Sequence, residues 1–318
     1  MNKFAILSIV GLLAATWFLA TSPSSDSVIE TEFMNFITQY GKNYATSEEH
    51  AFRLSVFKKN MEEAKVLAAK NPRATFGVTE FSDWTKEEFQ VLLGEKATSV
   101  SDYIEQYTDK SQDFGTSADF RENFKPIQNQ GSCGSCWTFA ATATFEAYKS
   151  IDKHEVPKMS EQELVDCVES CSGCGGGLAN LAYDWLVANS FCTEASYKYE
   201  ARDGTCKKSS CAAVSKDRGS GLVISGEEGI LSKLQTSGPV SISVDASTWS
   251  AYHGGILDSG CGMATNHAVV VTAYSPEEGG YWVIRNSWGP QYGEGGFIRL
   301  AYGKNMCNIE KRPSYPIF

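Results

Sequence analysis

The sequence predicts an α+β fold with two lobes, one mainly helical and one rich in strands. Helical patterns come first along the chain. Short runs of alternating apolar and polar residues, broken by Gly and Pro, begin at Val240. Helices followed by strands in separate stretches are typical of an α+β architecture. The chain has 318 residues, 42% of them hydrophobic, which is enough for one large domain or two of ordinary size.

The first helices are expected between residues 28 and 96, a stretch without cysteine. Apolar side chains recur at helical spacing from Phe33 to Tyr40. A second helix is expected from Ser47 to Lys70, capped by Thr46 or Ser47, because Asn71-Pro72 cannot continue it. Thr85, followed by Lys-Glu-Glu, predicts a third short helix.

The composition changes after a polar stretch, residues 97 to 118, which predicts an extended and poorly packed linker. All ten cysteines and most glycines lie beyond residue 110. Three further helices are expected, after Ser135, after Ser160 and from about Leu178 to Ala188. The strands are expected at Val240–Val244, Ala268–Tyr274, Tyr281–Asn286 and Gly296–Ala301.

Charge and cysteine content narrow the class of protein. A net charge of −10 repels nucleic acid and anionic lipid, so neither is an expected partner. Ten cysteines predict several disulfides and at least one free thiol in an oxidising compartment. Lys3, an apolar run from Phe4 and the small polar residues from Thr21 predict a signal peptide over residues 1–20. The alternative is a short membrane anchor, because the run is near the lower length limit for a span.

One cysteine has the setting of a nucleophile. Cys136 ends the string Gln130-Gly-Ser-Cys133-Gly-Ser-Cys136 and starts an apolar helix, whose positive end favours the thiolate. Of the four histidines, His267 opens an apolar strand and is the candidate base. Asn286 ends the next strand, where its amide is able to orient the imidazole.

The other three histidines have plainer interpretations. His50 lies in the helical N-terminal region, and His154 lies in a charged stretch as a solvated surface residue. His253 precedes two glycines and is expected in a loop.

The string Cys133-Gly-Ser-Cys136-Trp137 resembles the papain/cathepsin signature, in which His and Asn follow some 130–150 residues downstream, as His267 and Asn286 do here. The resemblance covers nearly the whole chain after residue 119. It continues through Ser160–Cys167, Cys174–Gly177, Asn266–Ala268, Asn286–Gly289 and Tyr292–Gly295. It implies a papain-like fold with the active site in the cleft between its lobes. It also implies peptide-bond hydrolysis through a thioester on Cys136.

The resemblance assigns roles residue by residue. Cys136 is the nucleophile, His267 the acid/base, Asn286 its orienter and Gln130 the side-chain donor to the oxyanion. Trp288 shields the His–Asn hydrogen bond from water. The substrate-binding residues implied are Gly176, Gly177, Leu178, Ala179, Ser243, Thr265, Asn266, Ala268, Trp288 and Arg312.

Position 312 corresponds to the floor of the pocket that receives the substrate residue two before the scissile bond. Cathepsin L-like relatives have a small neutral residue there, whereas this chain has Arg312. One interpretation is that Arg312 pairs with a substrate Asp or Glu. The other is that Arg312 turns to solvent or pairs with Glu310, and leucine-like residues are preferred.

The N-terminal region resembles the propeptide of the cathepsin L-like branch. Glu49, Arg53, Phe57 and Asn60 match its helix motif, whereas Ala64 and Ala68 depart from it. A second motif reads Gly77-x-Thr79-x-Phe81-x-Asp83, with Thr79 where Asn is usual.

The match implies an inhibitory propeptide over residues 21–96, a linker with the maturation site over 97–114 and a peptidase domain over 115–318. Cleavage is expected near Gln112–Thr116. Release is expected on acidification, when carboxylates such as Glu49 and Asp83 lose their pairing.

The disulfide pairs implied by the resemblance are Cys133–Cys174, Cys167–Cys206 and Cys261–Cys307. Cys192–Cys211 is favoured as a fourth pair, with Cys171 free. Three rival interpretations are an inert binding module, a dithiol oxidoreductase built on Cys133-x-x-Cys136 and a zinc site built on Cys167, Cys171 and Cys174.

The resemblance implies an endopeptidase, because no spare histidine pair is present for an exopeptidase loop. It also implies a monomer that needs no metal or cofactor. Such an enzyme acts on proteins and peptides, is inhibited by its own propeptide and is a target for cystatin-like inhibitors. It enters the secretory pathway and reaches a lysosome- or vacuole-like compartment or is secreted.

Overall fold

The computed structural model describes residues 25–95, 105–107, 113–207, 211–215, 219–223 and 226–318. The chain forms two compact units, residues 1–43 and residues 44–318. In the first unit, α1 (Ser25–Tyr40) is the predicted helix, with Phe36 against Tyr40 at a centroid distance of 5.3 Å. The predicted signal peptide, residues 1–20, lies outside the described residues. Within the described ranges, no helix is both long and apolar enough to cross a membrane.

The second unit begins with α2 (Ser47–Lys70), which matches the predicted bounds. Thr46 caps it by accepting the N–H of Glu49 at 3.1 Å, and Glu49 accepts the N–H of Ala45 in return at 2.9 Å. α3 (Lys86–Gln90) starts at a reciprocal capping box, formed by Thr85 and Glu88. The cap residues therefore predicted both helix starts correctly.

One face of α2 fastens the chain segment that returns beside it. Arg53 donates two hydrogen bonds to the carboxylate of Glu88, at 2.7 and 2.8 Å. The Asn60 amide donates to the carbonyl oxygens of Ser82 (3.0 Å) and Trp84 (2.9 Å), and Phe57 is fully buried. The helix motif seen in the sequence thus holds residues 82 to 88 in place.

The helical lobe is built around α4 (Cys136–Ile151), which is buried along most of its length. It packs with α5 (Glu161–Cys167) and α6 (Ala179–Ala188), near a small two-stranded sheet of β4 (Phe191–Cys192) and β5 (Ala213–Ser215). Ser160 caps α5 by accepting the N–H of Glu163 at 3.0 Å. The three predicted helices of this region are confirmed.

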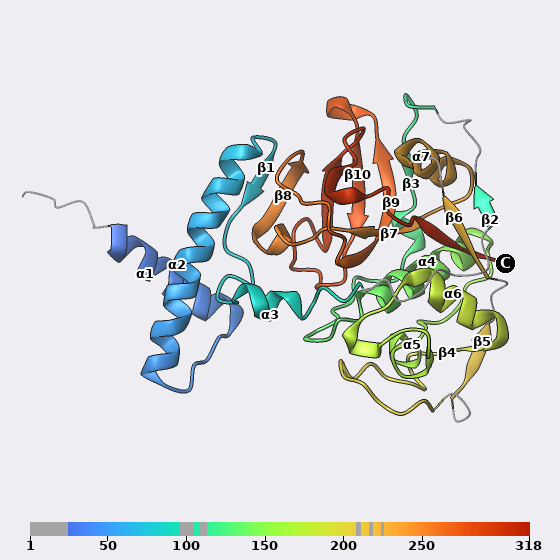
Figure 1. Ribbon diagram of the computed structural model, residues 1–318, viewed down its shortest axis with the longest axis horizontal. Helices are drawn as coiled ribbons and strands as arrows, with labels where there is room; N and C mark the ends of the chain where they lie inside the picture. Colours follow the sequence, from blue (N-terminus) through green and yellow to red (C-terminus); the bar gives the residue numbers. More distant parts are fainter. Residues whose placement is uncertain (1–24, 96–104, 108–112, 208–210, 216–218, 224–225) are drawn as a thin grey trace, which may run out of the picture. The chain divides into compact units, whose positions relative to one another are not determined.

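The strand-rich lobe is one mixed sheet (Figure 1). Within the described residues its order is β1 (Ala74–Phe76), β8 (Tyr252–Leu257), β11 (Phe297–Ala301), β10 (Tyr281–Arg285), β9 (His267–Ser275), β7 (Val240–Val244), β12 (Ser314–Ile317), β6 (Gly219–Val223) and β2 (Glu105–Tyr107), with β3 (Ala118–Asp119) also paired to β9. The four predicted strands are β7, β9, β10 and β11.

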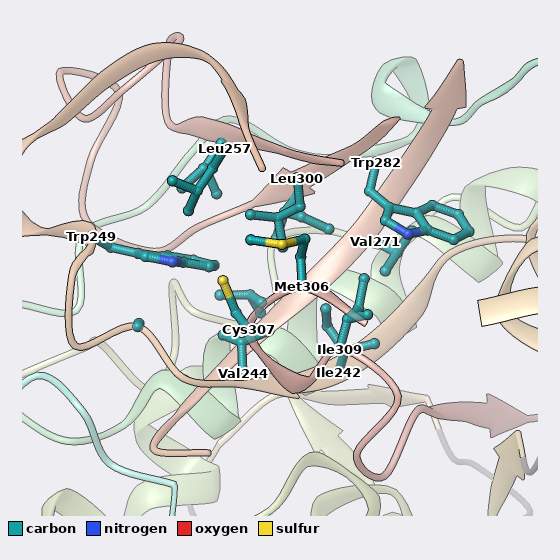
Figure 2. Packing of buried hydrophobic residues seen from close by; sticks show 14 of the residues in the cluster. Ile242, Val244, Trp249, Leu257, Val271, Trp282, Leu300, Met306, Cys307 and Ile309 are labelled. Carbon is teal, nitrogen blue, oxygen red and sulfur yellow. The ribbon is translucent and has the colours of Figure 1, made fainter. Parts of the chain in front are cut away.

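The core of this lobe lies where the middle strands meet the loops that follow them. Figure 2 shows Ile242 and Val244 of β7 and Val271 of β9 near Trp282, Leu300 and Ile309. The alternating pattern of the last third of the chain predicted all of these apolar positions except Ile309 as strand residues.

Several elements were not predicted, including β1, β3 and β6 of the lobe and β2 of the linker. The structure adds α7 (Gly226–Thr236), β8 and β12, although each contains Gly or Pro residues that argue against regular structure. β2 lies within the stretch expected as a poorly packed linker and pairs in parallel with β6. These residues are extended, as expected, but the sequence did not indicate that the edge of the sheet offers them a partner strand.

Candidate active site

Three elements bring the predicted catalytic side chains together. Cys136 is the first residue of α4, His267 is the first residue of β9, and Asn286 follows β10. β9 and β10 are antiparallel neighbours, so the start of β9 and the end of β10 lie side by side at the same end of the strands. The N–H of Ala268, the residue after His267, contacts Cys136 Sγ at 3.4 Å.

The hydrogen bonds around Asn286 define the protonation pattern of His267. Asn286 Oδ1 accepts the N–H of Ser287 at 2.8 Å, so this atom is the carbonyl oxygen of the amide. The same oxygen lies 2.8 Å from His267 Nε2, which must therefore carry the ring proton. Nδ1 of the neutral ring is then a bare acceptor. It is buried and has no hydrogen-bond partner among the described residues.

Two tryptophans enclose the imidazole. Trp288 stacks on His267 with ring centroids 4.7 Å apart and is almost fully buried. Trp249 meets His267 edge-on at 6.2 Å and Trp288 at 6.4 Å. The sequence analysis missed Trp249, because it stands in a polar stretch with no recognisable motif. Together the two rings exclude water from the His267–Asn286 hydrogen bond.

Gln130 presents an amide N–H₂ beside the nucleophile. The Ser287 hydroxyl donates to Gln130 Oε1 at 2.7 Å, which turns Nε2 the other way. Nε2 donates to the carbonyl oxygens of Cys133 and Leu92, both at 2.8 Å. The sequence analysis did not single out Ser287, although it lies inside the Asn-Ser-Trp-Gly motif. The arrangement is suited to holding an oxygen atom next to Cys136.

The end of the N-terminal region crosses this site. Gly177 donates its N–H to the carbonyl oxygen of Gly94 at 2.9 Å, and Glu95 donates its N–H to the carbonyl oxygen of Asn266 at 3.0 Å. A Cβ atom at Gly94 would overlap the carbonyl oxygen of Gly134, so only glycine fits this approach. The crossing segment closes the site.

Aromatic contacts continue this cover. Phe81 and Phe89 meet Trp288 edge-on, at 5.5 and 5.2 Å. Cys136 and His267 are both 0% exposed beneath it.

This cover sets the electrostatics of the pair. Burial raises the pKa of the Cys136 thiol to about 12 and lowers the pKa of His267 to about 4. Both groups are therefore neutral at pH 7 while the site is covered. The sequence analysis expected the helix terminus to favour a thiolate, but exclusion of water by the crossing segment outweighs the dipole in this state.

The structure gathers the expected substrate-binding residues around the same segment. Gly177 and Asn266 bind it from two sides through their backbones. Gly176 lies next to them, where its carbonyl oxygen accepts the N–H of Ser172 at 2.8 Å. Beside them is a small cavity of about 10 Å³, whose lining includes Leu178, Ala179, Ser243, Ala268 and Arg312. Burial raises the pKa of the Glu95 carboxylate, and hydrogen bonding by the Thr265 side chain, from the same region, lowers it and partly offsets the effect of burial.

The structure contains the four disulfides Cys133–Cys174, Cys167–Cys206, Cys192–Cys211 and Cys261–Cys307. They are the pairs expected from the sequence, and Cys136 and Cys171 are the free thiols. The dithiol interpretation fails because Cys133 is bonded to Cys174. The zinc interpretation fails because two of its three cysteines are in disulfides.

The remaining histidines lie away from the cleft chemistry. His154 is exposed, and His50 meets Tyr44 edge-on at 5.9 Å. The expectation of a loop at His253 was wrong, since it lies on β8, where Nε2 is 2.6 Å from the carbonyl oxygen of Val78. Pairing of β8 with β1 fixes this stretch despite its two glycines.

Comparison with known proteins places the chain in a family. The model described as "Papain family cysteine protease" matches residues 114–317, and that described as "Cathepsin propeptide inhibitor domain (I29)" matches residues 33–89. A "Cysteine proteinase" of Trypanosoma brucei brucei is 35% identical over 99% of this chain and 73% of its own length. "Fruit bromelain" of Ananas comosus is 31% identical over 99% of this chain and 95% of its own length.

Solved precursor structures are similar as well. A digestive procathepsin L2 proteinase of Tenebrio molitor superimposes with a TM-score of 0.83 at 29% identity, covering 91% of this chain and 100% of that one. A recombinant stem bromelain precursor gives 0.83 at 28% identity, covering 92% and 99%. With the covered Cys–His–Asn site, these matches establish that the chain belongs to the papain family of cysteine proteases, as an endopeptidase made as a zymogen with a cathepsin-type inhibitor propeptide.

Proposed function

We propose that Cys136, His267, Asn286 and Gln130 are the catalytic residues of this protease. The observation that carries the proposal is the unpaired Nδ1 of His267, among the described residues. The hydrogen bond between Nε2 and Asn286 holds the ring in place, and the N–H of the next residue, Ala268, donates to Cys136 Sγ. An imidazole with one nitrogen fixed and the other free to accept a proton is the form that a general base requires.

In the uncovered enzyme, His267 takes the Cys136 proton at Nδ1, and the thiolate attacks the carbonyl carbon of the peptide bond. His267 then gives that proton to the leaving amine, and a thioester remains on Cys136. Water, deprotonated by His267, hydrolyses the thioester and regenerates the thiol. Asn286 keeps the ring in the required tautomer throughout, and Trp288 keeps water from this hydrogen bond.

Gln130 stabilises the negative oxygen that forms in both halves of the reaction. In the precursor its Nε2 already binds a carbonyl oxygen, that of Leu92, at 2.8 Å. The backbone N–H of Cys136 supplies a second donor at the helix start. A donor of this kind contributes on the order of 3 kcal/mol to transition-state stabilisation.

We assign residues 21–96 to the inhibitory propeptide, 97–114 to the linker and 115–318 to the peptidase domain, with maturation near Gln112–Thr116. In support, the described part of the linker is anchored at both ends of this stretch. β2 pairs with the sheet edge, and the Gln235 amide donates to the carbonyl oxygens of Asp113 (2.7 Å) and Thr116 (2.8 Å). Cleavage near Gln112–Thr116 separates the two parts.

Four disulfides and the family place the protein among secretory or lysosomal-type proteases. We propose that residues 1–20 direct it into the secretory pathway and that it works in an acidic lysosome- or vacuole-like compartment or outside the cell. We further propose that the processed enzyme is a monomer and is inhibited by cystatin-like proteins that enter the uncovered cleft.

The test compares Cys136→Ala with Cys171→Ala, which removes the other free thiol. Purified precursors are acidified, and self-processing and peptide turnover are measured. Cys136→Ala is expected to abolish both, with turnover at least about 10⁴-fold lower, while Cys171→Ala retains both. Normal turnover by Cys136→Ala would contradict the assignment of the nucleophile.

A further inference from the structure

The end of the propeptide places an acidic side chain in a pocket of the peptidase domain. The N–H of Gly177 and the carbonyl oxygen of Asn266 bind the Gly94–Glu95 peptide from two sides, at 2.9 and 3.0 Å. The Glu95 side chain is carried into the cleft and buried, with only 8% of the residue exposed. A carboxylate is therefore removed from water at this point, which requires compensation from the pocket.

The groups around Glu95 supply that compensation in part. Burial raises the pKa of Glu95, whereas interactions with the Ser243 and Thr265 hydroxyls and the positive charges of Arg312 and Lys311 lower it. Of the two cations, Arg312 lines the small cavity beside the cleft, and Lys311 is exposed. Arg312 is thus the cation that belongs to the pocket.

Among the described residues, Arg312 has no carboxylate partner of its own. Its Nη1 is buried without a hydrogen-bond partner, and it forms no ion pair within 4.0 Å in the part of the chain that the structure describes. Glu310, the internal partner considered from the sequence, instead accepts the N–H of Glu227 at 3.0 Å. Oε2 of Glu95 is likewise buried and unbonded among the described residues. The Arg312 guanidinium is therefore left for whatever occupies the pocket.

We propose that Arg312 makes this pocket selective for acidic side chains, so that the protease prefers substrates with Glu or Asp two residues before the scissile bond. This rests on the proposed function, since the pocket selects substrates only if Cys136 attacks the peptide held beside it. Leu178, Ala179 and Ala268 contact the aliphatic part of the side chain, and the guanidinium donates to its carboxylate. Glu95 of the propeptide is the internal counterpart of that substrate residue.

An apolar side chain gains less in this pocket. A leucine covers Nη1 of Arg312 without pairing it and leaves a buried donor unsatisfied, which weakens its binding. Sites built around a polar partner discriminate more strongly than apolar pockets do, because the wrong ligand leaves buried groups unpaired. The preference expected here is therefore for charge, with size as the lesser factor.

The test uses the processed enzyme and three peptides identical except for Glu, Gln or Leu at that position. For the wild type, kcat/KM is expected to be at least about 10-fold higher for Glu than for Gln. Arg312→Ala is expected to lower the Glu-to-Leu ratio of kcat/KM at least about 10-fold. Arg312→Lys keeps the charge and is expected to retain part of the preference.

Lys311→Ala is the matched control, because it removes the same charge one residue away on the exposed side, and it is expected to change the ratio less than 2-fold. Should Arg312→Ala fail to fold, Arg312→Gln takes its place. If Leu is cleaved but Glu is cleaved no better by the wild type than by the Arg312 variant, the selectivity is overturned and the proposed function stands. If the wild type cleaves none of the peptides and its Cys136 is not alkylated by iodoacetamide, the proposed function itself fails.

Discussion

The propeptide segment from Tyr44 to Glu95 and the peptidase domain are stabilised by different chemistry. The segment has no cysteine, and polar contacts fasten it to itself, chiefly Arg53 to Glu88 and Asn60 to two backbone carbonyls. The peptidase domain has a large apolar core and four disulfides. The part that has to leave is held largely by hydrogen bonds and an ion pair, whereas the part that stays is held mainly by apolar packing and disulfides.

The largest expected difference between covered and uncovered states is in Cys136 reactivity. With its pKa raised to about 12 by burial, the thiol is almost wholly protonated at pH 7, and it is 0% exposed. Iodoacetamide is expected to alkylate Cys136 at least about 10³-fold more slowly in the precursor than in the processed enzyme. Mass spectrometry measures this, with Cys171 in the same molecules as the internal reference. Equal rates in the two states would show that the cover does not suppress the nucleophile.

Removal of a disulfide should affect the peptidase domain alone. The Cys167–Cys206 bridge closes a separation of 39 residues, and a loop of that length corresponds to about 4 kcal/mol of unfolding free energy. Replacing both cysteines by serine is expected to lower the stability of the processed enzyme by that amount in denaturant titrations. Precursor latency at neutral pH is expected to stay unchanged. Early activation of this variant would mean that the two regions are not independent.

Acidification is expected to stabilise the peptidase domain through Glu146. Burial raises the pKa of Glu146 to about 7, from an unfolded value near 4.5. Between these pH values the native state keeps a proton that the unfolded state has lost. Stability is therefore greatest below about 4.5 and falls as pH rises to 7, by about 3 kcal/mol.

Glu146→Gln removes this increment and keeps an oxygen for the N–H of Met159, which Glu146 Oε1 accepts at 2.6 Å. Unfolding of the alkylated, processed enzyme at pH 4.5 and 7 measures the effect, with the exposed Glu122→Gln as control. The prediction is wrong if both variants show the same pH dependence as the wild type.

The smallest effect concerns the polar contacts of the propeptide. Arg53→Met breaks the two hydrogen bonds to Glu88 and is expected to destabilise the covered state by about 1–3 kcal/mol. The lag before self-processing at mildly acidic pH should shorten accordingly. Lys65→Met is the control, because Lys65 and its partner Glu62 are both mostly exposed. An unchanged lag in Arg53→Met would show that the Arg53–Glu88 contact does not control the release of the propeptide.

Local signals in the sequence were sufficient for many of the regular elements and for selecting Cys136, His267 and Asn286, which the structure brings together. The bounds of α2 follow from Thr46 and Pro72, and those of β7 from the alternation of Val and Ile with Ser before a polar stretch. The elements that were missed depend on partners far away in the chain. β12 contains Pro316 and forms because β6 and β7 lie on either side of it.

What occupies the site and how its side chains are protonated were harder to predict than which residues form it. No pattern around Glu95 indicates that its side chain enters the cleft, because its position depends on how Gly94 passes Gly134. The neutral Cys136–His267 pair was also missed, since the helix dipole is visible in the sequence but the exclusion of water is not.

The pairing of β1 with β8 also bears on solubility. β1 lies at the edge of the sheet, where Ala74 and Thr75 pair with Gly255 and Gly254. Departure of the propeptide turns β8 into a new edge, and open edges invite pairing with strands of other molecules. The Glu294 carboxylate already accepts the N–H of Gly255 at 2.8 Å, so the new edge has an acidic side chain and one satisfied amide. While the propeptide is in place, β1 therefore covers this edge of the sheet.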